Sequence, residues 1–295
     1  MNEQHANAVV NKIKGAFTPT PKELDPFRAI QYGKHAILDL KDLVAYAAIE
    51  IKTDLPLSRL GRVSLERNGS ELIGWDAKLF HVRDEYLELP VQKKGVDSAT
   101  HTRLVLDFSD ETLRTLTGIR RGELVHLAGE QLVLKVAIKQ KHATDPNTPE
   151  FTARARVLPY QSVRFFQQRL TEVVIDHTLA GEQKHTFPLQ GGNVRLRRMF
   201  LETENNDITK VEIRRDNTPI YEINVDDLNF DLKRFHDKHV TDDYVIVDFI
   251  SGGWAAEQAF VPIAASSLQL VVTKRTAGNI NVHLDYLDIE RQVSM

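Results

Sequence analysis

A segment of the first half of the chain recurs in the second half, and this repeat constrains the fold more than any other feature. Residues 60–70 (Leu-Gly-Arg-Val-Ser-Leu-Glu-Arg-Asn-Gly-Ser) align with residues 208–218 (Ile-Thr-Lys-Val-Glu-Ile-Arg-Arg-Asp-Asn-Thr), which lie 148 positions later. Apolar residues align with apolar ones and basic with basic at Leu60/Ile208, Val63/Val211, Leu65/Ile213, Arg62/Lys210 and Arg67/Arg215. Because self-similarity at a long period marks repeated structural units, we expect the same fold twice.

Each copy of the repeat is predicted to be a β-hairpin. Polar and apolar residues alternate in both copies, and each run ends at Asn68-Gly69 or Asp216-Asn217 before a second apolar pair begins. These dipeptides tolerate the positive φ of a two-residue hairpin turn. Asn68-Gly69-Ser70 also matches a glycosylation signal, but the turn is the preferred interpretation.

Two further matches follow in the same order. Residues 106–108 align with 247–249 at an offset of 141, and residues 132–136 align with 268–272 at an offset of 136. The falling offset indicates shorter loops in the second copy. Each unit then spans roughly 130 residues, which suits an eight-stranded jelly roll better than a seven-stranded immunoglobulin-like sandwich.

The rest of the chain has the same β-rich texture, so the predicted fold class is all-β: two tandem eight-stranded jelly-roll β-sandwiches, a double jelly roll, with a short N-terminal arm. Strand-like runs occur at residues 45–52, 62–67, 103–108, 132–139, 193–201, 210–215, 244–249, 268–274 and 279–287. We expect an N-terminal arm and linker at 1–30, a first jelly roll at 31–160 and a second at 161–295. Residues 34–158 and 182–290 should superpose.

The N-terminal arm is predicted from a helix-compatible apolar pattern at Val9, Val10, Ile13 and Phe17, followed by prolines at 19, 21 and 26. We expect it to pack outside both sandwiches and to become ordered on a neighbouring subunit or a membrane. Deletion of residues 1–27 should then leave thermal unfolding nearly unchanged.

Composition excludes several classes of function. The chain has 38 basic and 41 acidic residues, a net charge of −3, so direct nucleic-acid binding is not expected. Cysteine is absent, which removes disulfides, thiolate zinc sites and cysteine nucleophiles. The sequence shows no signal peptide and no run of about 20 apolar residues, so we expect folding in a cytoplasm.

With these motifs in their order, the sequence resembles the double jelly-roll major capsid proteins of tailless, internal-membrane bacteriophages, nearest to the corticovirus (PM2-like) coat protein. The segments that carry the resemblance are residues 62–73, 79–86, 205–216, 244–249 and 268–287. Together they cover most of residues 34–290.

The resemblance implies a structural major capsid protein without enzymatic activity. Homotrimers would form pseudo-hexagonal capsomers that tile an icosahedral virion shell, because a trimer of duplicated domains presents six similar sides. The implied partners are neighbouring trimers, vertex (penton) proteins, membrane-associated virion proteins and the viral internal membrane. No cofactor is required; a structural Ca²⁺ between subunits would fit the family, although no ligand position maps onto this chain.

Several polar groups contain the residue types of functional sites, but none is predicted to be catalytic, cofactor-binding or metal-binding. Residues 236–239 (His-Asp-Lys-His), near Asp226, Asp227 and Asp231, contain metal-ligand types, but a polar loop is favoured. Asp107 and Asp248 occupy equivalent strand ends, and we expect them to lie far apart rather than to form a catalytic pair. The glycine pairs 191–192 and 252–253 lack the context of a phosphate loop.

The tryptophans and a group of arginines are open to two interpretations each. Trp75 and Trp254 could stack on sugars, but packing under loops is favoured. Arginines at 195, 197, 198, 214 and 215 could contact an acidic neighbour or lipid head groups, and we expect them on a solvated or intersubunit surface. The alternative functions are a β-sandwich carbohydrate-binding protein or a jelly-roll glycan hydrolase or amidase. The sequence offers neither an aromatic cluster nor a catalytic motif for them.

Overall fold

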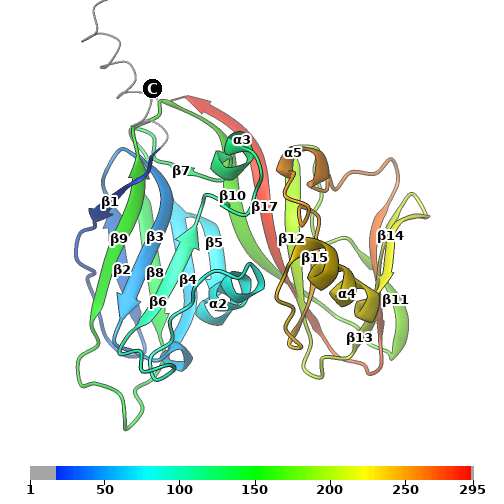
Figure 1. Cartoon of the computed structure of the whole chain (residues 1–295), viewed down its shortest axis with the longest axis horizontal. Coiled ribbons are helices and arrows are strands. Elements are labelled where there is room, and N and C mark those ends of the chain that lie inside the picture. Colours follow the sequence, from blue (N-terminus) through cyan, green and yellow to red (C-terminus); the bar gives the residue numbers. More distant parts are fainter. Residues whose placement is uncertain (1–17, 294–295) are drawn as a thin grey trace, which may run out of the picture.

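Two β-sandwiches lie side by side in the computed structural model, which describes residues 18–293 (Figure 1). The predicted helix-compatible positions 9, 10, 13 and 17 lie outside the described residues. No helix within 18–293 is long and apolar enough to cross a membrane.

The first sandwich is built from antiparallel strands in two facing sheets. One sheet has the order β1-β9-β3-β6, and the strands β5-β4-β8-β2 form the other. The bounds are β1 Thr20–Glu23, β2 His35–Leu40, β3 Ala45–Thr53, β4 Leu60–Arg67, β5 Ser70–Asp76, β6 Thr102–Asp107, β8 Leu132–Ile138 and β9 Phe151–Leu158. A short β7 (Leu124–Val125), a 3-10 turn (Leu57–Arg59) and the helix α3 (Leu116–Arg120) complete this half.

The second sandwich repeats this order strand for strand. Its sheets are β10-β17-β12-β15 and β14-β13-β16-β11. The bounds are β10 Val163–Ile175, β11 Gly181–Thr186, β12 Val194–Glu202, β13 Ile208–Arg215, β14 Thr218–Asn224, β15 Tyr244–Asp248, β16 Leu268–Lys274 and β17 Ile280–Val293, with a short helix α5 at Ala255–Gln258. Strands β1–β6, β8 and β9 thus correspond to β10–β17. This is a double jelly roll.

The predicted hairpins are β4–β5 and β13–β14, and their turns have the expected geometry. Asn68 and Gly69 have φ of 49° and 78°, and Asp216 and Asn217 have φ of 49° and 64°. Two successive residues with positive φ define a type I′ turn, whose twist matches that of the flanking strands. The hairpin interpretation of residues 68–70 is therefore confirmed.

Each hairpin leads directly into a helix, which the sequence pattern did not reveal. Helix α2 spans Ala77–Tyr86 after β5, and α4 spans Val225–His236 after β14. The N-cap residues, Asp76 and Asn224, are 148 positions apart, the same offset as the hairpins. Asp76 caps α2 by accepting a hydrogen bond from the backbone N of Lys78.

A β-bulge also recurs at the same place in both copies. The β3–β9 register shifts between Tyr46 and Ala48, and the β12–β17 register shifts between Leu196 and Arg198. At each bulge the backbone carbonyl of the extra residue accepts a hydrogen bond from the first residue after the neighbouring strand. Phe108 N donates to Ala47 O, and Phe249 N donates to Arg197 O, both at 2.9 Å. A bulge places two consecutive side chains against one partner residue and interrupts the alternation of faces.

The two sandwiches share one sheet. Strand β10 lies parallel to β5, with Leu170 beside Ile73, so the eight strands β15-β12-β17-β10-β5-β4-β8-β2 are continuous. The chain connects β9 to β10 through residues 159–162 alone. A single hydrophobic cluster contains buried residues of both sandwiches.

The expectation that residues 1 to about 27 form an arm outside both sandwiches is wrong for the part that the structure describes. Strand β1 pairs with β9, from Thr20 beside Val157 to Glu23 beside Arg154. Phe27 is 7% exposed and its ring lies 5.6 Å from that of Phe151. Pro21 confines this strand to a sheet edge, where a missing N–H is tolerated.

Candidate assembly interface

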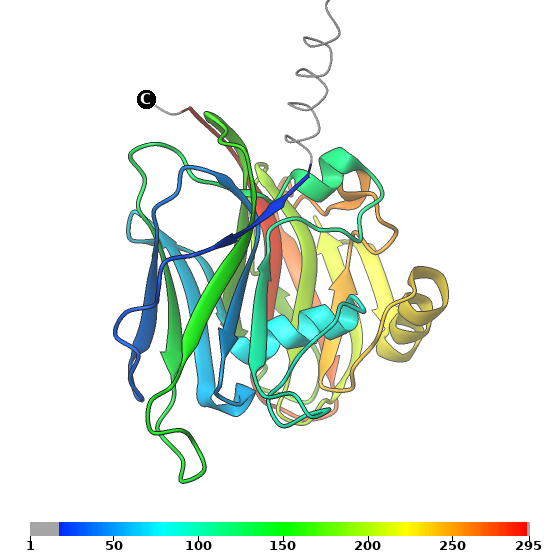
Figure 2. The same cartoon turned by 60° about the vertical axis from the view of Figure 1, so that its left-hand side comes forward.

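Helix α2 lies in the angle between the two sandwiches, and the second sandwich covers it. Figure 2 shows the helix crossing the middle of the molecule, while α4 stands at its outer side. Eight of the ten residues of α2 are buried, including the charged Arg83 and Asp84. The helix therefore serves as the contact between domains rather than as a surface element.

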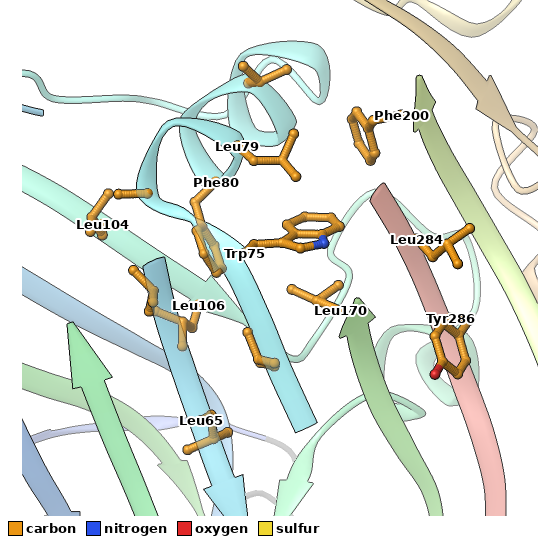
Figure 3. Packing of buried hydrophobic residues seen from close by; sticks show 14 of the residues in the cluster. Leu65, Trp75, Leu79, Phe80, Leu104, Leu106, Leu170, Phe200, Leu284 and Tyr286 are labelled. Carbon is orange, nitrogen blue, oxygen red and sulfur yellow. The ribbon is translucent and has the colours of Figure 1, made fainter. Parts of the chain in front are cut away.

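Aromatic rings form the apolar part of this contact (Figure 3). Trp75 at the end of β5 is fully buried, and its ring centroid lies 5.8 Å from Phe80 and 5.7 Å from Phe200 of β12. The indole Nε1 donates to the carbonyl of Thr171 in β10 at 3.1 Å. Tyr86 stacks edge-on against Phe200 at 6.3 Å. Edge-to-face pairs of this kind add stability beyond the area that they bury.

A buried arginine lies at the centre of the polar part. The guanidinium of Arg198, 2% exposed, donates to Asp110 at 2.8 Å, to Asp248 at 3.1 Å and to Asp285 at 3.2 Å. Arg197 donates to the same Asp285 at 3.0 Å through Nε. Because Asp110 belongs to the first sandwich and the other carboxylates to the second, Arg198 joins the domains directly.

Helix α2 extends the network from the first sandwich. The Tyr86 hydroxyl donates to Asp248 at 3.0 Å. Arg83 lies 2.8 Å from its neighbour Asp84 and 3.5 Å from Asp107 at the end of β6. Ion pairs buried in this way contribute geometric specificity, because every group is expensive to leave unpaired.

The network sets the charge state of its members. Burial lowers the pKa of the Arg198 guanidinium, but Asp110, Asp248 and Asp285 outweigh burial and raise the pKa well above its ordinary value. Burial raises the pKa of the Asp110 carboxyl, and Arg198 and Arg197 more than reverse this, so its pKa lies well below the usual range. For Asp107 burial dominates and raises the pKa to about 6.

A cavity of about 300 Å³ opens beside the network, lined by residues that include Arg83, Asp107, Asp110, Arg198 and Asp285. These charged groups are paired with one another: Arg83 with Asp107 in the first sandwich, Arg198 with Asp285 in the second, and Arg198 with Asp110 across the domain boundary. An arrangement of mutually neutralised charges fixes the position of two domains, whereas a catalytic site keeps a base or nucleophile free for the substrate. We therefore interpret the contact as structural.

The prediction that the arginines occupy a solvated or intersubunit surface is wrong for two of the five. Arg197 and Arg198 are buried against the first sandwich, at 4% and 2% exposure. The repeated bulge at Arg197 is the reason, because it interrupts the alternation from which surface positions were inferred. Arg195 binds the carbonyls of Gly192 and Val194 at 2.8 Å each. Arg214 pairs with Glu212 and Arg215 stacks on Phe260.

The tryptophans have different positions from those expected. Trp75 packs between the domains rather than under a loop, and Trp254 is 43% exposed with the guanidinium of Arg114 over its ring at 5.5 Å. Asp107 and Asp248 lie at equivalent strand ends and bind different arginines. Asp107 lies 3.5 Å from Arg83 and Asp248 lies 3.1 Å from Arg198, so the two carboxylates do not share a partner and form no catalytic pair.

The histidine-rich segment after α4 is placed by backbone contacts. His236 ends the helix, Asp237 adopts the left-handed conformation with φ 52°, and His239 N donates to the carbonyl of Tyr86 at 3.2 Å. Within residues 18–293 no group of three or more metal-ligating side chains is gathered. The glycine pairs 191–192 and 252–253 lie in loops.

Sequence reasoning missed α2 and its ion pairs entirely. Asp76 in the N-cap position, at the end of β5, was the available signal. Helix α2 lacks an amphipathic pattern because it is covered on most sides, so periodicity could not reveal it.

Comparison with known families identifies the chain. The model for the viral coat protein P2 N-terminal domain matches residues 21–158, and the model for the viral coat protein P2 C-terminal domain matches residues 167–290. The chain belongs to the viral coat protein P2 family. It is a structural capsid protein of a virion, not an enzyme, and the resemblance inferred from its sequence is confirmed.

Solved structures show the same fold. The major capsid protein P2 from bacteriophage PM2 superposes with a TM-score of 0.77 at 14% identity, covering 94% of this chain and 99% of that chain. The STIV MCP, from Sulfolobus turreted icosahedral virus, gives a TM-score of 0.66 at 9% identity over 91% and 96% of the two chains. The PBCV-1 virus capsid gives 0.62 at 9% identity over 94% and 96%. No curated protein sequence matches significantly.

Proposed function

We propose that this coat protein forms homotrimers, that each trimer is a pseudo-hexagonal capsomer, and that capsomers tile an icosahedral shell. The observation that carries the proposal is the exact repetition of strand order, hairpin offset and bulge in the two sandwiches. Three chains then present six similar sides, so one gene product fills hexagonal positions in a closed lattice.

The remaining partners follow from the same role. We infer that the chain assembles in the host cytoplasm and contacts neighbouring trimers, vertex proteins and membrane-associated virion proteins or the internal membrane. The two units, residues 31–160 and 161–295 with β1 added to the first, act as the two sides that each subunit contributes. Calcium bound between subunits stays a prediction, and its test is the effect of a chelator on assembled trimers.

The mass of the purified full-length protein in solution tests the trimer. Light scattering coupled to gel filtration should give about three times the chain mass of 33.6 kDa, constant over dilution. Negative-stain images should show particles with a six-sided outline. Only monomer across a wide concentration range would contradict the proposal.

A further inference from the structure

The second hairpin–helix unit carries exposed apolar residues where the first has buried ones. Ile220 of β14 is 43% exposed, and Phe230 and Phe235 of α4 are 62% and 69% exposed. At the constant offset of 148 their counterparts are Leu72, Val82 and Leu87, whose exposures are 0%, 6% and 9%. Single large apolar side chains are often exposed on a protein surface, but three in one structural unit indicate a surface that binds a partner.

The first unit shows what kind of surface covers such residues. Strand β5 pairs with β10, and α2 packs on the outer face of the sheet β10-β17-β12-β15, where Phe200 and Asp248 contact Tyr86. The equivalent sheet of the first sandwich is β1-β9-β3-β6. Its outer face, and the free edge of β1, have no counterpart of α2 upon them within the described chain.

A hollow marks the equivalent place on that sheet. A pocket of about 290 Å³ is lined by residues that include Pro21, Ala48, Glu50, Asp107 and Arg156. By strand register these correspond to Leu170, Arg198, Phe200, Asp248 and Asp285. Of these, Leu170 pairs with β5, and Phe200 and Asp248 contact Tyr86 of α2. The pocket therefore lies on the β1-β9-β3-β6 sheet at the position equivalent to the one that α2 covers on the β10-β17-β12-β15 sheet.

We propose that α4 and β14 of one protomer dock on the β1-β9-β3-β6 face of a second copy of this chain, repeating between subunits the contact that α2 makes within one. The proposal rests on the proposed trimer and names its interface. The parallel pair Leu170–Ile73 has Pro21 and Tyr221 as its counterparts, so β14 continues the sheet beside β1 of the second copy.

The geometry and the charges agree with a second copy as the occupant. Strands β1 and β14 lie at opposite sides of the molecule in Figure 1, as a head-to-tail ring requires. The first turn of helix α4 contains Asp226 and Asp227. The facing sheet presents Arg154 and Arg156, whose side chains are 53% and 52% exposed and pair with Glu50 and Glu111 of the same chain. Opposite charges at the rim of an interface favour the correct partner and register.

A disulfide test uses the absence of native cysteine. Thr20 and Ile220 are both exposed in the protomer and each precedes the Pro21–Tyr221 pair by one residue, so the proposed register brings their Cα atoms within disulfide range. The double variant Thr20→Cys/Ile220→Cys should form covalent dimers and trimers on mild oxidation. Each single variant, and the matched control Thr20→Cys/Leu179→Cys, should form at least tenfold less. Leu179 is 67% exposed and lies outside the proposed contact.

A second test removes the apolar contact. Phe230→Asp/Phe235→Asp should convert the trimer to a monomer of unchanged secondary structure, whereas Leu179→Asp should remain trimeric by light scattering. A trimeric wild type in which the cysteine pair does not cross-link above control, or in which the Phe variant stays trimeric, overturns this interface and leaves the trimer standing. A monomeric wild type overturns both.

Discussion

The helices α2 and α4 are equivalent elements of the two hairpin–helix units, yet α2 is almost wholly buried and α4 has only Leu228 and Leu232 buried. Neither the offset nor the capping position differs between them. The difference lies in what stands beside each: the second sandwich covers α2, and no described residue of another domain covers α4. In a duplicated chain, residues that are exposed in one unit and buried in the other can therefore be identified as candidates for an interface.

Replacement of Trp75 should give the largest difference in stability loss between the two hairpin–helix units. Trp75→Ala removes a fully buried ring with two aromatic neighbours, and we expect a loss of about 5 kcal/mol in the free energy of unfolding. The counterpart change, Ile223→Ala on half-buried β14, should lose about 1 kcal/mol in the isolated protomer. Urea unfolding measures both. Equal losses would contradict the view that only the first unit is covered.

Replacing Arg198 should have the next largest effect. Arg198→Met leaves three buried carboxylates without their shared partner, so we expect a loss of about 3–4 kcal/mol in the free energy of unfolding. Arg195→Met, on the same strand but bonded only to carbonyls, should change it by about 0.5 kcal/mol or less. A small loss for Arg198→Met would show that the network is not what joins the sandwiches.

Removal of the N-terminal segment distinguishes β1 from what precedes it. Deletion of residues 1–27 removes strand β1 and the Phe27–Phe151 contact, and we expect it to lower the stability of the first sandwich by about 2–3 kcal/mol. Deletion of residues 1–17 is the control, since it leaves both in place. Thermal melts that coincide for the two truncations would restore the original view of a detached arm.

The smallest effect expected depends on pH and concerns Asp107. Its pKa of about 6 lies above the value of 3.8 for an unfolded aspartate, because the buried site favours the protonated carboxyl. The folded state is therefore most favoured below pH 3.8, where Asp107 is protonated, and loses this contribution to its stability as the pH rises through 6. Asp107→Asn should match the wild type near pH 4 and exceed its stability by about 1–2 kcal/mol at pH 7.5, the 29% exposure of the side chain moderating the effect.

Urea unfolding at the two pH values measures this difference. Asp242→Asn, which changes an exposed carboxylate, controls for the loss of one charge. If Asp107→Asn is less stable than the wild type at pH 7.5, its attraction to Arg83 outweighs its burial.

The sequence revealed the parts of the fold that depend on local pattern. The hairpins at 60–76 and 208–224 were predictable because alternation and turn residues act over a few positions. Strand β10 was missed because it is covered on both sides where it meets β5, so its residues do not alternate cleanly. The match between Leu106–Phe108 and Val247–Phe249 located two equivalent strand ends correctly.

The interface could not be predicted, because it depends on which surfaces meet. Arg197 and Arg198 looked like surface residues in a strand, and only the bulge and the presence of the first sandwich place both in the interior. Pro21 appeared to be part of a linker, whereas it lies in an edge strand. Long-range pairing of this kind leaves no periodic trace in one sequence.

The four-residue connection between β9 and β10 has a consequence for how a shell grows. It holds the two sandwiches at an effective concentration in the millimolar range, so their mutual contact forms during the folding of a single chain. Such a contact can include buried charges whose desolvation would slow an encounter between separate molecules. In a ring made of these chains, contacts within a chain alternate with contacts between chains. The contacts within a chain form when that chain folds, and only those between chains depend on protein concentration and salt.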